Sequence, residues 1–181
     1  MNPLLRVVLT LVVAGLSIPV AGLAAQILRP EGEANVEILE IDRVVRMRLA
    51  LPVDRETAFD AWTVSTNLVE WLPHWVEMQV AEGEKFIMGW DGYEGVWTGT
   101  YLEVDRPERL VFTWVAPEGV FPSGSYETIV TLTFEEVEEG RTSLLLEHSG
   151  FRESAELESQ LQAWRGYMFA LRAHLLRPTA D

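Results

Sequence analysis

Histidines are the side chains of this sequence best suited to acid–base or metal chemistry, and there are three: His74, His148 and His174. No two of them stand in an HxH, HxxxH or HExxH spacing, and the 181 residues include no cysteine. Zinc sites are built mainly from Cys and His at such short spacings. The sequence therefore predicts no metal site, and it excludes disulfides, a cysteine nucleophile and a lipid anchor on cysteine.

His148 is the strongest candidate for a functional histidine. It follows Leu144 and Leu146 at alternate positions, so on a strand all three side chains point to the same inward face. There it could bond to the backbone, hold a ligand oxygen, or act as a general base tuned by burial. Ser149 is its neighbour, but adjacent strand residues point to opposite faces, so the two cannot form a catalytic dyad. With no nucleophile to place beside His148, a binding role is favoured over catalysis.

The other two histidines have weaker claims to a function. His74 stands between Pro73 and Trp75 in a predicted loop, where an exposed side chain is expected and a mobile lid residue is the alternative. His174 falls off the apolar stripe of the predicted C-terminal helix and is expected to be solvated. The sequence contains no GxSxG motif, no glycine-rich phosphate loop and no dinucleotide-binding fingerprint. An enzyme is therefore the less favoured hypothesis.

Aromatic residues carry the stronger functional signal. Seven tryptophans are many for a chain of this length, and each is large, with an N–H that needs a partner. On inward faces such residues either fill the core or line a cavity that is apolar with a few polar groups. The expected ligand-binding set is Trp90, Phe112, Trp114, Phe134, His148, Trp164 and Met168. Within this set Trp114, His148, Trp164 and Met168 are favoured most.

Alternation of apolar and polar residues predicts a series of antiparallel strands. In residues 43–51 (RVVRMRLAL), Val45, Met47, Leu49 and Leu51 share one face. Further strands are predicted over 75–81, 85–90, 95–104, 110–114, 126–137 and 142–148. Turn residues separate them, including a glycine at 83, 92 and 140.

Three helices are predicted. Asp54 is expected to cap the first, with Phe59 and Trp62 facing inward, and Ser65 or Thr66 to cap a second, short one. The third carries an apolar stripe at helical spacing, formed by Leu157, Leu161, Trp164, Met168, Leu171 and Leu175. An antiparallel sheet must bury one face, and only this last helix is long enough to cover it, which predicts an α+β fold.

The N-terminal residues 1–25 read as a secretory signal peptide rather than as part of the fold. Arg6 precedes 19 uncharged residues, and Pro19, Gly22 and small residues end the run. An uncleaved membrane anchor is the alternative, because a run of this length approaches a bilayer span. Residues 26–40 then form an acidic leader. In both cases the domain is expected outside the cytoplasm, periplasmic or secreted.

The charge balance excludes two classes of partner. The chain carries 14 Lys and Arg against 28 Asp and Glu, a formal net charge of −14. Nucleic-acid binding depends on basic residues that neutralise phosphates, and anionic bilayers attract basic segments. Neither nucleic acid nor an anionic membrane surface is therefore an expected partner.

Four segments are distinctive when taken in order. They are residues 55–73 (RETAFDAWTVSTNLVEWLP), 99–114 (GTYLEVDRPERLVFTW), 130–151 (VTLTFEEVEEGRTSLLLEHSGF) and the helix with Trp164, Leu171 and Leu175. Together they resemble the Hsp90-ATPase-activator-homologue (AHSA1-like) branch of the START-like (SRPBCC) superfamily. The resemblance runs from about residue 43 to 176 and predicts a domain over 41–178.

The resemblance implies a helix-grip fold, in which a curved antiparallel sheet wraps around the long C-terminal helix and leaves a cavity between them. Members bind small apolar or amphipathic ligands, and some relatives in the wider superfamily are cyclases or hydrolases. The chain departs from the family where a glycine pair is usual, since only Gly83 is present, and the segment after Pro73 looks shortened. An exported relative is not expected to activate Hsp90, which is a cytoplasmic chaperone.

Three functional hypotheses follow. The favoured one is an exported protein that binds a small apolar or amphipathic molecule without a cofactor. The second is a cyclase- or hydrolase-type enzyme with His148 as its base, and it requires a buried polar constellation around that residue. The third is a module that binds a protein partner through its surface, and it requires an exposed apolar patch of several hundred Å².

Overall fold

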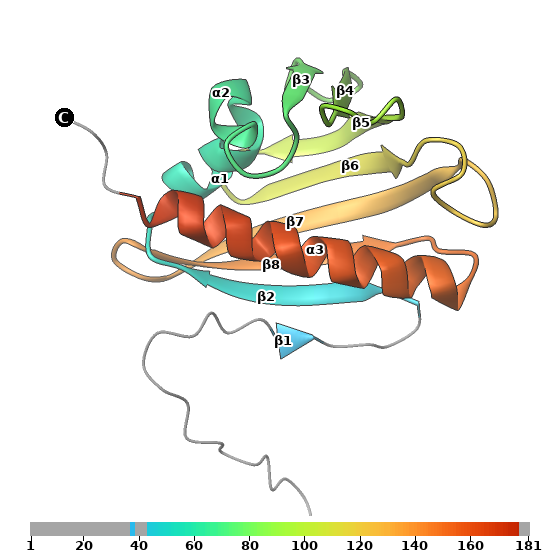
Figure 1. The fold of residues 1–181 in the computed structure, drawn as a ribbon. Coiled ribbons are helices and arrows are strands. Elements are labelled where there is room, and N and C mark those ends of the chain that lie inside the picture. The colour runs from blue at the N-terminus through green and yellow to red at the C-terminus, as the bar shows by residue number, and fades with distance from the viewer. Residues whose placement is uncertain (1–36, 39–42, 178–181) are drawn as a thin grey trace, which may run out of the picture. The chain divides into compact units, whose positions relative to one another are not determined.

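The computed structural model describes residues 37–38 and 43–177 (Figure 1). The proposed signal peptide lies outside the described residues, as does most of the acidic leader. Within these described residues, eight strands form one antiparallel sheet in the order β1-β2-β8-β7-β6-β5-β4-β3. The strands are β1 (Glu37–Ile38), β2 (Val45–Leu51), β3 (Trp75–Met78), β4 (Lys85–Gly89), β5 (Val96–Asp105), β6 (Arg109–Val115), β7 (Glu127–Glu138) and β8 (Arg141–Ser149).

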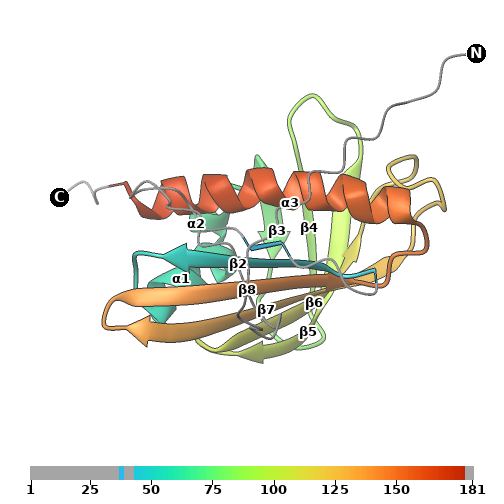
Figure 2. The same ribbon diagram turned by 90° about the horizontal axis from the view of Figure 1, so that it is seen from below.

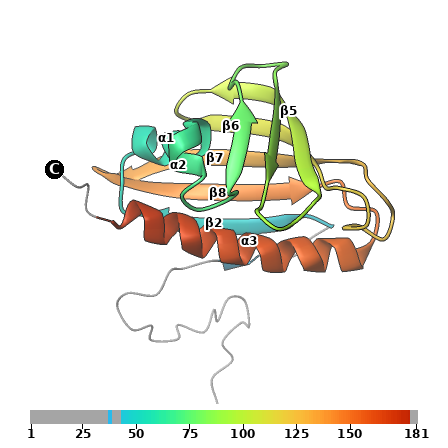
Figure 3. The ribbon, with the colours of Figure 1, turned by 45° about the horizontal axis from the view of Figure 1, so that its top comes forward.

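Three helices cover one face of this sheet: α1 (Arg55–Thr63), α2 (Ser65–Leu68) and α3 (Ser154–Leu175). Figure 2 shows α3 running along the sheet, and Figure 3 shows α1 and α2 beside it on the same face. Leu157, Trp164, Met168 and Leu171 of the apolar stripe are buried. The predicted α+β helix-grip fold is confirmed.

The alternating pattern of β2 explains why it packs as it does. Val45, Met47, Leu49 and Leu51 are buried, and the residues between them are more exposed. The strand pairs antiparallel with β8, and Val45 lies opposite His148. The pairing of β2 with β8 thus brings together inward residues that lie far apart in the sequence.

The predicted cap of the first helix is confirmed, but that of the second is wrong. The Asp54 carboxylate accepts a hydrogen bond of 2.8 Å from the backbone N–H of Thr57. Val64, not Ser65 or Thr66, is the N-cap of α2, and it makes no side-chain capping bond. The reason is that α1 runs almost directly into α2, with the Val64 N–H already bonded to the Asp60 carbonyl.

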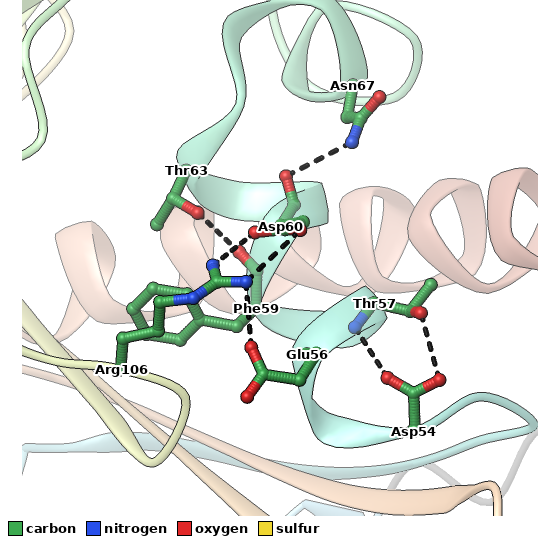
Figure 4. A network of polar contacts seen from close by, with 8 residues as sticks. All are labelled: Asp54, Glu56, Thr57, Phe59, Asp60, Thr63, Asn67 and Arg106. Atoms are coloured by element: carbon green, nitrogen blue, oxygen red, sulfur yellow. Dashed lines mark hydrogen bonds and ion pairs between the residues drawn. The ribbon is translucent and has the colours of Figure 1, made fainter.

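Arg106, in the turn between β5 and β6, fastens α1 to the sheet (Figure 4). Its guanidinium forms ion pairs with Asp60 and, at 2.7 Å, with Glu56. It also lies 5.6 Å from the ring centroid of Phe59, within the range of a cation–π contact. The Arg106 side chain thus links α1 to the turn between β5 and β6 through partly exposed ion pairs.

Gly99 allows β4 and β6 to approach β5 closely. A β-carbon at this position would collide with the Thr113 carbonyl oxygen and with the ring of Phe86. We expect Gly99→Ala to lower the free energy of unfolding by about 1–3 kcal/mol, as overpacked cores do. Urea unfolding followed by fluorescence measures this.

Gly166→Ala is the matched control, because a β-carbon there meets open space in the middle of α3. It should stabilise the protein by about 0.5–1 kcal/mol, since alanine favours the helix over glycine. An unchanged free energy of unfolding for Gly99→Ala would contradict the close packing of the strands around this glycine.

Candidate functional site

A small pocket lies between the α1–α2 pair and the inner face of the sheet. Its free space is about 10 Å³, which has room for about one water molecule. The lining residues are Trp62, Leu68, Leu72, Phe86, Met88, Tyr101, Leu110, Phe112 and Trp114. Trp62 comes from α1, Leu68 from α2 and Leu72 from the segment that follows α2, and β4, β5 and β6 contribute the others. The walls are thus almost wholly apolar and aromatic.

Three polar atoms belong to these lining side chains. The Tyr101 hydroxyl donates to the sulfur of Met78 at 3.5 Å, and burial raises the pKa of Tyr101, so the phenol stays neutral. The indole nitrogens of Trp62 and Trp114 are buried and have no hydrogen-bond partner among the described residues. None of the lining residues carries a charge. Two indole donors without an acceptor among the described residues thus belong to side chains that line the pocket.

His148 lies in a buried hydrogen-bond chain within the core. The indole N–H of Trp164 donates to His148 Nδ1 at 2.9 Å. Because Nδ1 accepts this bond, the one proton of the neutral ring lies on Nε2. Nε2 then donates to the Thr128 hydroxyl at 2.7 Å. The hydroxyl in turn donates to the Trp114 carbonyl oxygen at 2.7 Å. Every polar hydrogen in this chain has a defined acceptor.

The surroundings of His148 keep its ring uncharged. The residue has no exposed surface, and burial lowers its pKa to about 3. Both ring nitrogens are occupied by core partners, so neither offers a free lone pair or proton to a guest molecule. This geometry favours a structural role for His148 over that of a general base.

The structure separates the predicted ligand-binding residues into two groups. Phe112 and Trp114 line the pocket. Phe134, His148, Trp164 and Met168 are each at most 1% exposed and belong to the packed core, outside the lining set. The cavity was expected between the long helix and the sheet, whereas this pocket lies under the short helices. Contact of a ligand with any of the seven residues stays a prediction.

Trp90 belongs to neither group. Its strand was expected to include it, but β4 ends at Gly89. The Trp90 ring is partly buried and packs against Trp97 at 4.5 Å and Tyr167 at 6.1 Å between centroids. It therefore joins an aromatic cluster between the β4–β5 connection and α3.

Several pocket residues were not among those predicted. Trp62 is predicted to face inward but is not in the expected ligand-binding set. Leu68, Leu72, Phe86, Met88, Tyr101 and Leu110 also line the pocket. The only signal in the sequence was the inward-facing position of these residues on short elements. That signal does not show whether α1 and α2 pack against the sheet without leaving a space.

The remaining histidines lie near the surface. His74 is exposed, as expected, and its Nδ1 accepts a 3.0 Å hydrogen bond from the backbone N–H of Asp91. The expectation that His174 is solvated is wrong, because it is partly buried in a groove between α3 and the α1–α2 pair. Over residues 37–38 and 43–177, no three His, Asp or Glu side chains gather closely enough to hold a metal ion.

Glu156 organises the start of α3 and the loop before β7. Its carboxylate accepts hydrogen bonds from the Tyr126 hydroxyl at 2.5 Å and from the backbone N–H groups of Ser123, Arg152 and Glu153 at 3.0–3.2 Å. Burial alone would raise the pKa of Glu156, but these bonds outweigh it and lower the pKa to about 2. The group is therefore a charged structural anchor rather than an acid–base candidate.

We expect Glu156→Gln to lower the free energy of unfolding by about 1.5–3 kcal/mol at pH 7, the range for hydrogen bonds to a charged group. The NH₂ group of the glutamine side chain carries two hydrogens and cannot accept a hydrogen bond from the donors that surround this position. The folded pKa lies below the unfolded value, so the stabilisation is present above about pH 4.5 and is lost toward pH 2. Denaturant titrations at pH 7 and pH 3 measure both effects. An equal loss for the variant at the two pH values would contradict the role of the charge.

Comparison with known proteins agrees with this geometry. The sequence profile of the family described as "Activator of Hsp90 ATPase homolog 1-like protein" matches residues 52–175. The chain belongs to this family. The predicted AHSA1-like, START-superfamily assignment is thus confirmed. No curated protein matches the chain.

Solved structures share the AHSA1-like fold at low sequence identity. A protein from Mesorhizobium loti is 24% identical over 76% of this chain and 99% of its own, with a TM-score of 0.68. CalU16 from Micromonospora echinospora is 20% identical over 80% and 85%, with a TM-score of 0.61. An HSP90 activator from Plasmodium falciparum is 21% identical over 75% and 97%, also at 0.61. At this identity the likeness establishes the AHSA1-like fold alone.

Proposed function

We propose that this AHSA1-like protein is an exported module that binds a small apolar or amphipathic molecule in the pocket under α1 and α2. At the level of the family, the fold supports a ligand-binding or co-chaperone-like module. The observation that carries the finer proposal is the pocket itself, whose walls are apolar and whose two buried indole donors have no partner among the described residues. Small-molecule sites combine such walls with a few convergent polar groups.

The arrangement around His148 argues against the enzyme alternative. A base needs a free lone pair within reach of a substrate, and both nitrogens of His148 are engaged by Trp164 and Thr128. No charged residue lines the pocket to assist catalysis. A binding protein requires neither feature.

The proposal of export rests on residues 1–25. Their single charge, long uncharged run and small-residue end are typical of a secretory signal. Within the described part of the chain, no helix combines the length and apolar character needed to cross a bilayer. Intact-mass measurement of the protein from its native host tests this. A mass that corresponds to a chain beginning near residue 25 or 26 supports cleavage, and a full-length mass supports the anchor.

Extraction of the natively purified protein, followed by mass spectrometry of small molecules, tests the binding function. We expect an apolar or amphipathic compound near equimolar amount. Leu68→Phe places a larger side chain in the pocket wall and should abolish retention, whereas Val137→Phe, at an exposed position of β7, should not. Equal retention by parent and both variants would place the compound elsewhere, and no bound compound from several growth conditions would contradict the function.

A further inference from the structure

A hollow on the sheet face turned away from α3 (Figure 2) is far roomier than the pocket under α1 and α2. It has about 440 Å³ of free space. Its lining residues are Glu77, Met78, Lys85, Phe86, Ile87, Thr98, Gly99, Thr100, Thr113, Val115 and Glu127. Ile87 lies between Phe86 and Met88, which face the helices, so its own side chain points to the opposite face. Gly99 and Thr113 are buried, whereas the three charged residues are exposed and stand at the rim.

Five of the lining residues form one continuous row across the sheet. Each is the register partner of the next: Glu77 on β3, Ile87 on β4, Thr98 on β5, Val115 on β6 and Glu127 on β7. Register partners share a face of the sheet. Adjacent strands lie about 4.8 Å apart, so the row is about 19 Å long. It carries a carboxylate at each end and two aliphatic side chains and a threonine between them.

The charged side chains of the hollow are unpaired, unlike charged side chains elsewhere on the sheet. Arg46 and Arg109 each form an ion pair with a glutamate, at 2.6 and 2.9 Å. Lys85 is the only lysine of the chain, and its side chain has no ion pair or hydrogen bond among the described residues. The same holds for the side chains of Glu77 and Glu127, although they line the same hollow. Two carboxylates and one ammonium group thus keep their hydrogen-bonding capacity for a guest.

A partly exposed indole lies beside this row. Trp75 precedes Glu77 by two residues on β3, so both side chains point to the same face. The indole crosses Gly89, where three of its atoms lie within 2.9 Å of the position that a β-carbon would occupy. Trp75 is nevertheless 36% exposed. The glycine thus makes room for an aromatic surface that stays open to solvent next to the charged rim.

We propose that this hollow is a second binding site, which takes a short neutral oligosaccharide lying across the strands. A sugar ring presents hydroxyls around its edge and C–H groups on its faces. The hydroxyls suit the unpaired carboxylates and the ammonium group, because hydrogen bonds to charged groups are the strong ones. The C–H groups suit the indole and the aliphatic middle of the row. This site does not depend on the pocket under α1 and α2 or on the function proposed for that pocket.

The chemistry of the hollow disfavours other extended ligands. A nucleic acid or another polyanion would meet two carboxylates and a single lysine. A peptide gains most by pairing with a free strand edge, whereas the hollow lies on a sheet face, where backbone groups bond to neighbouring strands within the plane of the sheet. An aliphatic chain would cover charged groups without bonding to them. An oligosaccharide uses the charged rim and the apolar middle together.

Titration of the intact protein with cellotetraose, maltotetraose and N-acetylated chitotetraose, followed by ¹H–¹⁵N NMR, tests the site. We expect at least one tetrasaccharide to bind with a Kd of about 1 mM or below. The amide resonances of the five row residues should shift, and those of the residues that line the pocket under α1 and α2 should stay in place. The matching disaccharide should bind at least about tenfold more weakly, because it is too short to reach both carboxylates of a row about 19 Å long.

Trp75→Ala and Glu127→Ala, at opposite ends of the site, should each weaken binding of the tetrasaccharide about five- to tenfold. Glu139→Ala is the control, since it removes an exposed carboxylate outside the hollow and should leave the Kd unchanged. The resonance shifts in the parent protein decide the matter even if a variant folds poorly.

Two outcomes overturn the site. One is the failure of all three tetrasaccharides to shift the row resonances at millimolar concentration. The other is tighter binding of an uncharged peptide of serine and threonine, which would assign the hollow to a polypeptide. Neither outcome bears on the function proposed above, because that function is measured by extraction of a compound from the pocket under α1 and α2.

Discussion

Trp164→Ala is expected to lower the free energy of unfolding by about 3–5 kcal/mol, the usual cost of deleting a large buried aromatic side chain. The ring is 1% exposed at the centre of α3 and packs against Trp62, Trp114 and Tyr167. Its removal also leaves His148 Nδ1 without a donor, which adds the penalty of an unpaired buried acceptor. Chemical denaturation monitored by circular dichroism measures the loss.

Two further variants separate packing from hydrogen bonding. Trp164→Phe keeps most of the ring volume but lacks the N–H, so it should recover much of the stability. Phe169→Ala, on the same helix but 50% exposed, should cost well under 1 kcal/mol. A small effect of Trp164→Ala would contradict the burial of this helix face.

The second large effect is a loss of stability in mild acid that originates at His148. The folded protein keeps this ring neutral because burial lowers its pKa to about 3, whereas the unfolded chain takes up a proton near pH 6.5. The stabilisation from the neutral ring is therefore complete above about pH 6.5 and is lost as the pH falls toward 3. The free energy of unfolding should drop by about 1.4 kcal/mol per pH unit over this range, or about 2 kcal/mol between pH 6.5 and 5.

His148→Asn isolates this contribution, because asparagine does not titrate. The variant should be less stable than the parent at pH 8, since one amide cannot reproduce both ring hydrogen bonds. Between pH 6.5 and 5, however, it should lose about 2 kcal/mol less than the parent. Parallel pH profiles of the two proteins would show that the ring is protonated in the fold. Subtracting one profile from the other cancels the titration of the many surface carboxylates.

The sequence was sufficient for the elements, because each has a local signature. The alternation in β2, the Asp54 cap and the stripe through Trp164 depend on residues only a few positions apart. One exception was α2, where the local preference of Ser65 for a cap yielded to the continuing backbone bond between Val64 and Asp60. The capping preference of a single residue is a weak predictor where the preceding helix already sets the backbone conformation.

The candidate site depends on relations that the sequence does not show. The inward-facing position of His148 on its strand was predicted. Its hydrogen-bond partners were not, because Thr128 and Trp164 reach it from another strand and from α3. The pocket depends on how closely Trp62 and α2 pack against β4–β6. An inward-facing position, inferred from the alternation of residues, does not distinguish a side chain that fills the core from one that borders a void.

The pairing of β2 with β8 has a consequence for how the chain folds. The ion pair between Arg46 and Glu147 crosses this junction, and the two residues are 101 positions apart. Contacts of such long range are slow to form, because the loop between them must be closed before they contribute. As synthesis delivers the N-terminus first, β2 has no strand to join along this edge until β8 follows. The hydrophobic face of β2 is therefore exposed, and open to aggregation, during that delay.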